Sequence, residues 1–515
     1  MKSVFFNSEV LAVEEKIIDS LSIPSIILME NAGLNSTNYI LSHYEHLLDE
    51  PVVILTGKGN NAGDGFVITR HLAINGLKSK IISVYPTDVL KGDAKTNYDI
   101  IKSFPGELIE FVNLENPEEI GQHLSGRKQL TIDAIFGVGF KGELDERLST
   151  IVKQINDNKN LTIVSIDVPS GLENYNQQKD SINAISTLSM GTKKFNSLFY
   201  TGKERCGKIE VVNIGVPEFM FDKFNADKIY EVEEKDVVIP QRGVTSNKYS
   251  GGKVFVLAGA KGYTGAATLC AEASLRTGSG AVTIGFPESL DDIFEKKLTD
   301  VVKLALPETA NASLSLKGYD LIKEKIKWSD VTLIGPGLSR DEDTMALVRK
   351  VVSEIENNYV IDADGLFAII GHTDILKESK SNIILTPHFG EFSGLLGITS
   401  EELKEDFYKR AKAFAKENNV ILVLKNAPTI ISDGKSSFIN STGHENLATV
   451  GTGDVLAGIV SSLYSQSGNA LESAISGVYL HGYCGDILYE KTGGSSTIAS
   501  DLLDVIGSAK SKLTN

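Results

Sequence analysis

The sequence predicts an α/β protein with two three-layer αβα domains, and two observations support this prediction. Short apolar runs of strand length alternate with segments of helix length, which is typical of parallel sheets covered by helices on both faces. The chain has 515 residues, too many for one ordinary hydrophobic core. Beyond Val216 the pattern lapses into residues rich in Pro and charge, so we expect domains over 1–225 and 226–515.

The composition is that of a globular protein, with 42% hydrophobic and 23% charged residues. The chain has neither a signal-peptide core at its start nor the run of about eighteen apolar residues that would span a membrane. We therefore expect a cytoplasmic protein with no membrane partner. A net charge of −16 argues against nucleic-acid binding. Three cysteines without paired spacing are expected to be reduced and buried: Cys206, Cys270 and Cys484.

Strand-like runs in the first domain are bounded by turn residues and separated by helix-length segments. In parallel sheets, ligands bind beyond the carboxyl ends of the strands. The residues that follow each strand are therefore the first candidates for a site. The expected strands are 52–55, 79–84, 130–133, 161–166 and 209–214, and the expected helices include 65–75 and 144–156.

A polar loop follows the first of these strands, from Thr56 to Gly65. Its Gly-x-Gly is shared with dinucleotide-binding folds, but Asn60, Asn61 and Asp64 stand where that fingerprint should continue. We therefore do not predict a Rossmann NAD site from it. A polar loop that bears an acid suits sugar hydroxyls or a cation better.

Two later strands each end in an aspartate, Asp133 and Asp167. One such residue could simply cap a helix or turn the chain. Two at one edge of a sheet, together with the Asn-rich loop and Lys141, favour an active site. Lys141 could also be an ordinary solvated loop lysine.

In the second domain, strands are expected at 253–258, 282–285, 331–334, 359–362, 382–385 and 420–424. The most informative segment follows them, at Asn446–Gly458. Gly451 and Gly453 precede an apolar run with helical spacing, so they lie where a turn leads into a helix. Because glycine has no Cβ atom, the backbone N–H groups of this turn can approach a phosphate closely. The partial positive charge of the helix N-terminus would help to hold the phosphate there.

Asp454 is unexpected beside an anion site, because a carboxylate repels phosphate. We propose that it removes a proton from a substrate hydroxyl as that hydroxyl attacks the terminal phosphate; alternatively, it caps the helix. Lys425 could offset phosphate charge or be a solvated strand end. His388 could bind a ligand or be structural, and Tyr263 could stack on a ring or fill a gap.

The first domain resembles the amino-terminal epimerase domain of the bacterial bifunctional NAD(P)H-hydrate repair enzymes. The resemblance implies a Rossmann-like fold and a substrate, NADH or NADPH hydrated at C6 of the nicotinamide ring, whose R and S forms are interconverted. Ser186–Gly191 with Lys193 is a looser match, since the family usually has Phe-Gly there. The matching segments are Leu28–Gly33, Asn60–Gly65, Arg70–Leu72, Asp133–Gly137 and Asp167–Leu172.

This resemblance implies roles for individual residues. Asn61, Asp133 and Ser170 would coordinate a potassium ion. We assign Lys141 and Asp167 as the acid–base pair, because reversing a carbinol centre through ring opening moves protons on and off one group. The residues expected to contact the hydrate are Asn60, Asn61, Ala62, Gly63, Asp64, Gly137, Val138, Gly139, Phe140, Lys141, Gly142, Glu143 and Asp167.

The second domain resembles the ribokinase-like fold and, more narrowly, the carboxy-terminal NAD(P)H-hydrate dehydratase domain. Both halves match in the order found in the bifunctional enzymes. Departures from the family pattern are Phe389, Val450, Asn426 and Ser339, and Val450 adds a Cβ beside the anion turn. The matching segments are Gly335–Leu338, Asp362–Gly365, Leu385–Glu391, Asn446–Gly458 and Tyr479–Gly482.

The resemblance implies that the second domain dehydrates the S hydrate at the expense of ADP, or of ATP, with magnesium. Asp454 would take the C6 hydroxyl proton, the nucleotide would phosphorylate the oxygen, and phosphate would leave. Ala266, Gly337, His388 and Asp454 would contact the hydrate. The expected nucleotide ligands are Lys425, Asn426, Ala427, Pro428, Thr429 and Gly453.

Two other functions are compatible with these motifs. A vitamin-type kinase of the same fold, with a regulatory first domain, would accumulate a stable phosphorylated product. Alternatively, the first domain could be a binding scaffold, although Asn61, Asp133, Lys141 and Asp167 speak against that. For the repair enzyme we expect a homo-oligomer, a tetramer or larger.

Overall fold

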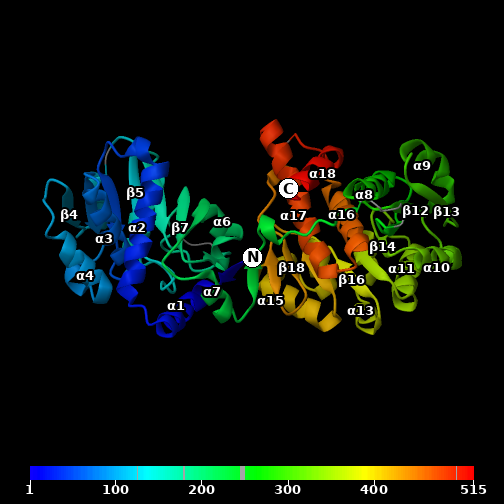
Figure 1. Ribbon diagram of the computed structural model, residues 1–515, viewed down its shortest axis with the longest axis horizontal. Helices are drawn as coiled ribbons and strands as arrows, with labels where there is room; N and C mark the ends of the chain where they lie inside the picture. Colours follow the sequence, from blue (N-terminus) through cyan, green and yellow to red (C-terminus); the bar gives the residue numbers. More distant parts are fainter. Residues whose placement is uncertain (125, 178–179, 244–249, 495, 515) are drawn as a thin grey trace. The chain divides into compact units, whose positions relative to one another are not determined.

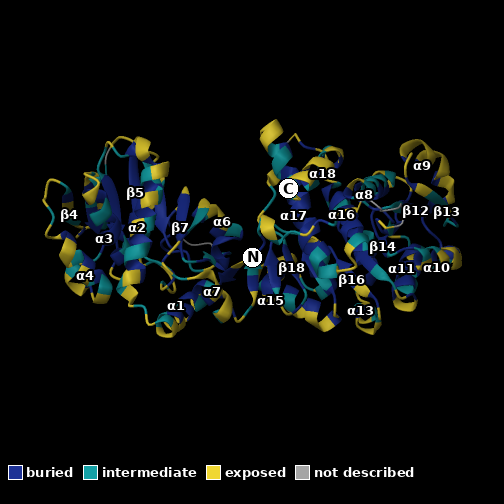
Figure 2. Ribbon diagram, viewed as in Figure 1, coloured by how far each residue is buried: buried dark blue, intermediate teal, exposed yellow. Residues whose placement is uncertain are grey.

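The chain folds into two compact units in this computed structural model, Lys2–Lys228 and Ile229–Asn515 (Figure 1). Each unit has a central sheet with helices on both faces. The central strands are buried, and the exposed residues lie mainly on the helices, the loops and the strands at the sheet edges (Figure 2). The structure describes residues 1–124, 126–177, 180–243, 250–494 and 496–514.

The main sheet of the first unit is parallel throughout, in the order β4-β3-β2-β5-β6-β7-β9. Two short strands, β1 (Lys2–Phe5) and β8 (Lys193–Lys194), pair in parallel outside it. The strands of the main sheet are β2 (Val52–Thr56), β3 (Ser79–Ser83), β4 (Ile109–Asn113), β5 (Gln129–Ala134), β6 (Leu161–Ile166), β7 (Ser186–Met190) and β9 (Lys208–Val212).

Alternate residues of β2 face opposite cores, since Val52 and Ile54 belong to one apolar cluster and Val53 and Leu55 to another. This is why helices must cover both faces of the sheet. Among the described residues no single helix is long and apolar enough to cross a membrane; α1 and α2 meet that test only as a pair bent by 114°. The helices are α1 (Asn7–Leu21), α2 (Ser25–His43), α3 (Asn60–Ile74), α4 (Gly92–Ile101), α5 (Glu146–Asp157), α6 (Tyr200–Cys206) and α7 (Glu218–Phe224).

The expected polar loop before residue 65 is wrong in part, because α3 already begins at Asn60. Asn and Gly favour turns, but here close packing outweighs that propensity. A Cβ at Gly63 would lie 2.6 Å from the Met29 sulfur, and one at Gly65 would lie 2.9 Å from the Ala134 Cβ. The first turns of α3 therefore sit tightly against α2 and the sheet, and only glycine fits.

The sheet of the second unit runs in the order β13-β12-β11-β14-β15-β16-β17-β18-β19-β10. It is parallel from β13 to β17, and the hairpin β17-β18-β19 is antiparallel. The sequence analysis did not predict β18 and β19, which form a hairpin that turns at Asp433-Gly434 with Gly434 at φ +80°. The strands are β10 (Ile229–Glu231), β11 (Lys253–Leu257), β12 (Ala281–Pro287), β13 (Val302–Leu306), β14 (Val331–Ile334), β15 (Asn358–Ile361), β16 (Asn382–Leu385), β17 (Ile421–Leu424), β18 (Ile430–Ser432) and β19 (Ser437–Ile439).

Helix α16 (Thr452–Ser467) is the central helix of the second unit. Leu456 and Val460 pack in the cluster that includes the sheet, whereas Val455, Ile459 and Leu463 pack in a second cluster with α18. The predicted apolar run after the glycine turn is thus a buried helix. The other helices are α8 (Thr264–Thr277), α9 (Asp291–Lys297), α10 (Tyr319–Trp328), α11 (Glu342–Glu354), α12 (Asp364–Ile369), α13 (Asp374–Glu378), α14 (Phe389–Leu396), α15 (Ser400–Asn418), α17 (Ala470–Thr492) and α18 (Ala499–Leu513).

Close contact between α16 and α8 generates the first prediction. A Cβ at Gly458 would clash with the Cys270 carbonyl oxygen and lie 2.7 Å from the Ala273 Cβ. We expect Gly458→Ala to destabilise the second unit by about 1 to 3 kcal/mol, measured by calorimetry on the full chain. Gly507→Ala on α18 is the control, because a Cβ there meets nothing within 4 Å and should be neutral or slightly stabilising. Equal transitions in the two variants would contradict the packing argument.

Candidate functional site

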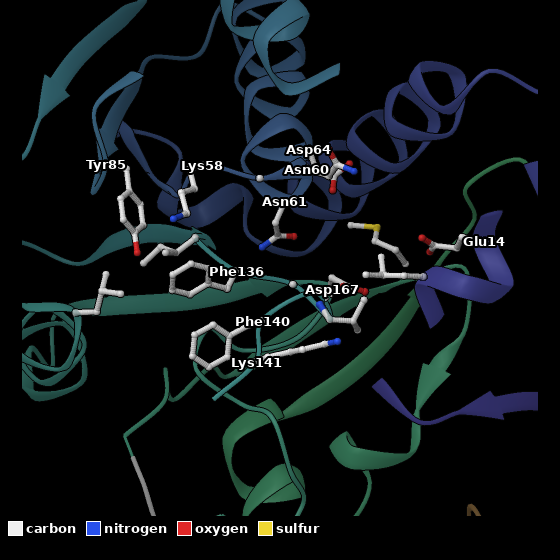
Figure 3. A pocket seen from close by; sticks show the side chains of 18 of the residues that line it. Glu14, Lys58, Asn60, Asn61, Asp64, Tyr85, Phe136, Phe140, Lys141 and Asp167 are labelled. Carbon is white, nitrogen blue, oxygen red and sulfur yellow. Dashed lines mark hydrogen bonds between the residues drawn. The ribbon is translucent and has the colours of Figure 1, made fainter. Parts of the chain in front are cut away.

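The first unit has a cavity of about 540 Å³ at the carboxyl ends of β2, β5 and β6 (Figure 3). Most of the predicted substrate-binding residues line it. Ala62 and Gly63 do not, because they are buried where α3 packs, and Gly142 instead donates its backbone N–H to Glu173. The predicted residues that line the cavity are Asn60, Asn61, Asp64, Gly137, Val138, Gly139, Phe140, Lys141, Glu143 and Asp167.

Asp167 is held firmly at the end of β6. Its φ of 68° is uncommon for a residue other than glycine, which marks it as a constrained position. One carboxylate oxygen lies 2.6 Å from Lys194 Nζ, and the other accepts the Val138 N–H at 2.9 Å. Lys194 is fully buried and also donates to the Met190 carbonyl. The structure therefore pairs Asp167 with Lys194, whereas Lys141 is exposed at the cavity wall.

Sequence reasoning missed Lys194, although it singled out the neighbouring Lys193. Successive residues of a strand point to opposite faces, so a Lys-Lys pair in β8 puts one lysine inside. That alternation was the only signal, and a two-residue strand is too short to reveal it.

Two further carboxyl groups face the same cavity, from Glu14 on α1 and Asp64 on α3. Burial, and then the nearby Asp167, raise the pKa of Glu14 to about 7, although Lys194 opposes the shift. Burial, Asp167 and Glu14 together raise the pKa of Asp64 well above its ordinary value. Glu14 was not predicted, because it lies far from the motifs in sequence.

The predicted potassium ligands are only partly consistent with such a site. Asp133 is fully buried and accepts hydrogen bonds from the Ser165 hydroxyl, the Ser170 amide and hydroxyl, and the Ile135 amide. Those bonds occupy the acceptor positions of a carboxylate. The buried Asn61 side chain has no partner for its Nδ2 among the described residues, but this nitrogen is a hydrogen-bond donor, so it suits an acceptor atom of a ligand and not a cation. No group of three or more His, Cys, Asp or Glu in the described parts of the chain could hold a metal ion.

The second unit brings Lys425, at the end of β17, to the glycine turn before α16. Lys425 Nζ lies 2.8 Å from the Asp362 carboxylate and 4.0 Å from that of Glu391. A Cβ at Gly453 would lie 3.4 Å from the same Nζ, so the lysine and the turn share one site, as the sequence predicts. Burial lowers the pKa of Lys425, but Asp362 and Glu391 outweigh it and raise the pKa overall.

Asp454 lies in the first turn of α16 but is not its cap, since the N-cap is Gly451 at φ 95°. Burial and the Asp362 carboxylate raise the pKa of Asp454 to about 7, although Lys425 opposes them. Burial also raises the pKa of Glu391, with Asp362 adding to the shift. One lysine therefore lies among several carboxylates, and the raised pKa of Asp454 reflects this excess of negative charge together with burial.

The other predicted contacts of the second unit lie around this cluster. His388 caps α14, with Nδ1 accepting from the Gly390 and Glu391 amides, yet 61% of its side chain is exposed. Gly337 packs against Tyr263 and Ala266. The predicted nucleotide ligands Asn426, Ala427, Pro428 and Thr429 follow β17, where the Thr429 hydroxyl donates to the Asn426 carbonyl.

His481 on α17 contacts the backbone of the glycine turn at Thr452. Burial lowers its pKa to about 4, so the ring is neutral and its Nε2 can donate to the Thr452 carbonyl at 2.9 Å. Sequence reasoning included this residue in a matching segment without assigning it a role.

A parallel αβα unit with a lysine-bound carboxylate cluster, followed by a second with a glycine turn at a helix N-terminus, defines a two-domain α/β enzyme. Residues 25–195 match the family model described as YjeF-related protein N-terminus, and residues 254–507 match NAD(P)H-hydrate dehydratase.

Two relatives are each named bifunctional NAD(P)H-hydrate repair enzyme. The Moorella thermoacetica protein is 35% identical over 94% of this chain and 92% of its own length. The Thermofilum pendens protein is 32% identical over 98% of this chain and 95% of its own length. A Bacillus subtilis ADP/ATP-dependent NAD(P)H-hydrate dehydratase crystal structure shares 26% identity and a TM-score of 0.47, covering 55% of this chain and 98% of its own. The chain belongs to the family of bifunctional NAD(P)H-hydrate repair enzymes.

The buried ion pair in the first unit generates the second prediction. Lys194→Met removes the cation and leaves Asp167 without its charged partner, so we expect the first unit to lose about 3 to 5 kcal/mol of stability. Lys193→Met, at the neighbouring and less buried position, is the control. The double variant Lys194→Met with Asp167→Asn should recover part of the loss. Calorimetry that finds Lys194→Met as stable as the control would refute the pairing.

Proposed function

We propose that this enzyme repairs hydrated NADH and NADPH. The first unit interconverts the R and S forms of the hydrate. The second unit dehydrates the S form to NAD(P)H. The reaction consumes ADP, or alternatively ATP, and with ADP it releases phosphate and AMP. The observation that carries the proposal is the match to relatives of that name along nearly the whole chain, with a polar site in each unit.

In the second unit, Gly453, Lys425 and the N-terminus of α16 would hold the nucleotide phosphates. Magnesium, when bound with the nucleotide, would neutralise charge on the transferred phosphoryl group. Because the described residues offer no dedicated three-ligand cluster, the phosphates and water would supply most of its ligands, as is usual for magnesium.

Asp454 would accept the proton of the C6 hydroxyl as its oxygen takes the terminal phosphoryl group. The phosphorylated oxygen then leaves as phosphate with the electrons of the C6–O bond, assisted by the ring nitrogen. Loss of a proton from C5 restores the ring double bond. A carboxyl group with a pKa of about 7 suits the first step, since it is partly ionised at neutral pH and still basic.

In the first unit, Asp167 and Lys141 are the proposed acid–base pair at the carbinol oxygen. The ion pair with Lys194 and the Val138 amide fix the Asp167 carboxylate, so it can meet a hydroxyl in one orientation. The exposed Lys141 at the cavity wall can return a proton to the oxygen.

Potassium bound by Asn61, Asp133 and Ser170 is also a proposal. Amide, carboxylate and hydroxyl oxygens suit this cation in kind, and Asn61, whose side-chain oxygen would be its ligand, lines the cavity. When bound, potassium would supply positive charge beside the hydrate. An oligomer of four or more chains and a cytoplasmic location are predictions of the same kind.

The dehydratase assignment predicts the behaviour of Asp454→Asn. With the hydrate mixture and ADP or ATP, the wild-type protein should restore the absorbance of the reduced cofactor. The variant should bind nucleotide yet lose activity by about 100-fold or more, because the amide cannot take the proton. In the wild type, kcat/KM should rise with pH up to about 7 and then level off, since only the ionised carboxyl is a base. A stable phosphorylated product instead of the reduced cofactor would favour the kinase function.

The epimerase assignment predicts that Asp167→Asn and Lys141→Ala each slow the equilibration of the R and S hydrates, followed by chromatography in the absence of nucleotide. Asp167→Asn should lose about 100-fold or more and Lys141→Ala less, because water can replace an exposed acid. Lys193→Ala serves as a matched lysine control. Wild-type rates in both variants would remove these residues from the mechanism.

A further inference from the structure

The inner face of α1 presents Glu14 to the cavity of the first unit. Glu14 is one turn from the buried Val10 and Ile17, whereas its neighbour Glu15 is exposed. The Glu14 carboxyl group points into the cavity (Figure 3), and among the described residues nothing donates a hydrogen bond to it or pairs with it. The fold therefore holds an unpartnered acid at the wall of the pocket.

The charged groups that face Glu14 come from three other elements. Asp64 lies on α3, Asp167 follows β6, and Lys194 lies on β8. Lys194 Nζ already serves Asp167 and the Met190 carbonyl, so this one buried cation faces three carboxyl groups. Lys58 and Lys141 line the same cavity from exposed positions, where water screens their charge. Because an unpaired buried carboxylate is costly, part of this cluster stays protonated at neutral pH, and the pKa of about 7 at Glu14 agrees.

Epimerisation through ring opening needs protons at two atoms. When the C6–N1 bond breaks, the carbinol oxygen loses its proton and becomes a carbonyl oxygen. The ring nitrogen takes the electron pair of the broken bond and needs a proton of its own. Asp167 and Lys141 are the proposed groups for proton transfer at the oxygen, but neither is assigned to the proton transfer at the ring nitrogen.

We propose that Glu14 is a further catalytic residue, the acid that protonates the ring nitrogen as the C6–N1 bond breaks. This inference rests on the proposed epimerase function. After rotation about C5–C6, the nitrogen attacks the other face of the carbonyl carbon and returns its proton to the Glu14 carboxylate. The oxygen regains its own proton, so the cycle leaves every group as it began.

The test compares Glu14→Gln with Glu15→Gln, a matched change on the exposed face of the same helix. R-to-S equilibration is measured without nucleotide, after subtraction of the rate without protein, and folding is checked by circular dichroism. We expect Glu14→Gln to lose about 100-fold in kcat with little change in KM, and Glu15→Gln to match the wild type. Glu14→Asp, which keeps the acid on a shorter side chain, should recover part of the rate.

The pH profile separates Glu14 from Asp64. The wild-type kcat should fall as pH rises through about 7, because the acid form is lost, and Glu14→Gln should lack that limb. Persistence of the limb in Glu14→Gln and its loss in Asp64→Asn would overturn the proposal, as would wild-type kcat in Glu14→Gln. If the wild type itself fails to equilibrate the hydrates, the proposed function falls together with this inference; an active wild type with an active Glu14→Gln removes only the inference.

Discussion

Both sites depend on one lysine set against more carboxyl groups than it can neutralise. Lys194 pairs with Asp167 at 2.6 Å in the first unit, and Lys425 pairs with Asp362 at 2.8 Å in the second. Removing charges from water is expensive, so a buried cation compensates one carboxylate and leaves its neighbours short of a partner. Burial and the excess negative charge then move the pKa of a nearby acid to about 7, in Glu14 and in Asp454. The same imbalance thus raises the pKa of one acid in each unit, and these are the two acids that we propose as proton carriers.

The fold creates this imbalance by bringing strand ends together. In each parallel sheet the carboxyl ends of neighbouring strands deliver side chains to one edge, and a glycine-bearing helix start closes the site beside them. Glycines at the start of α3 let it pack against the sheet, and Gly451 at φ 95° turns the chain into α16. The partial burial of these sites also makes the unpaired acids costly to ionise. The gathering of strand ends and helix starts at one edge of each sheet therefore accounts both for the shape of the sites and for the raised pKa values of their acids.

The sequence predicts much of this, because strand ends are local features. Strands β6, β14 and β16 fall on the predicted residues, and Lys425 and Gly453 meet as the motifs require. Lys194 and Glu14 were not predicted, since their importance comes from burial beside Asp167, which no local pattern encodes. The loop expected over Asn60–Gly65 is the start of α3, where packing outweighs the turn preference of Asn and Gly. The sequence alone does not show which charged side chains the fold brings into the same site.

Infrared difference spectroscopy of the protonated carboxyl stretch, recorded across pH on the full chain, tests the charge imbalance most directly. The account predicts that the wild type retains carboxylic acid signal up to about pH 7, that Asp454→Asn removes one part of it, and that Glu14→Gln removes another. A wild-type spectrum with no carboxylic acid signal left above about pH 5, where ordinary Asp and Glu side chains are ionised, would contradict it.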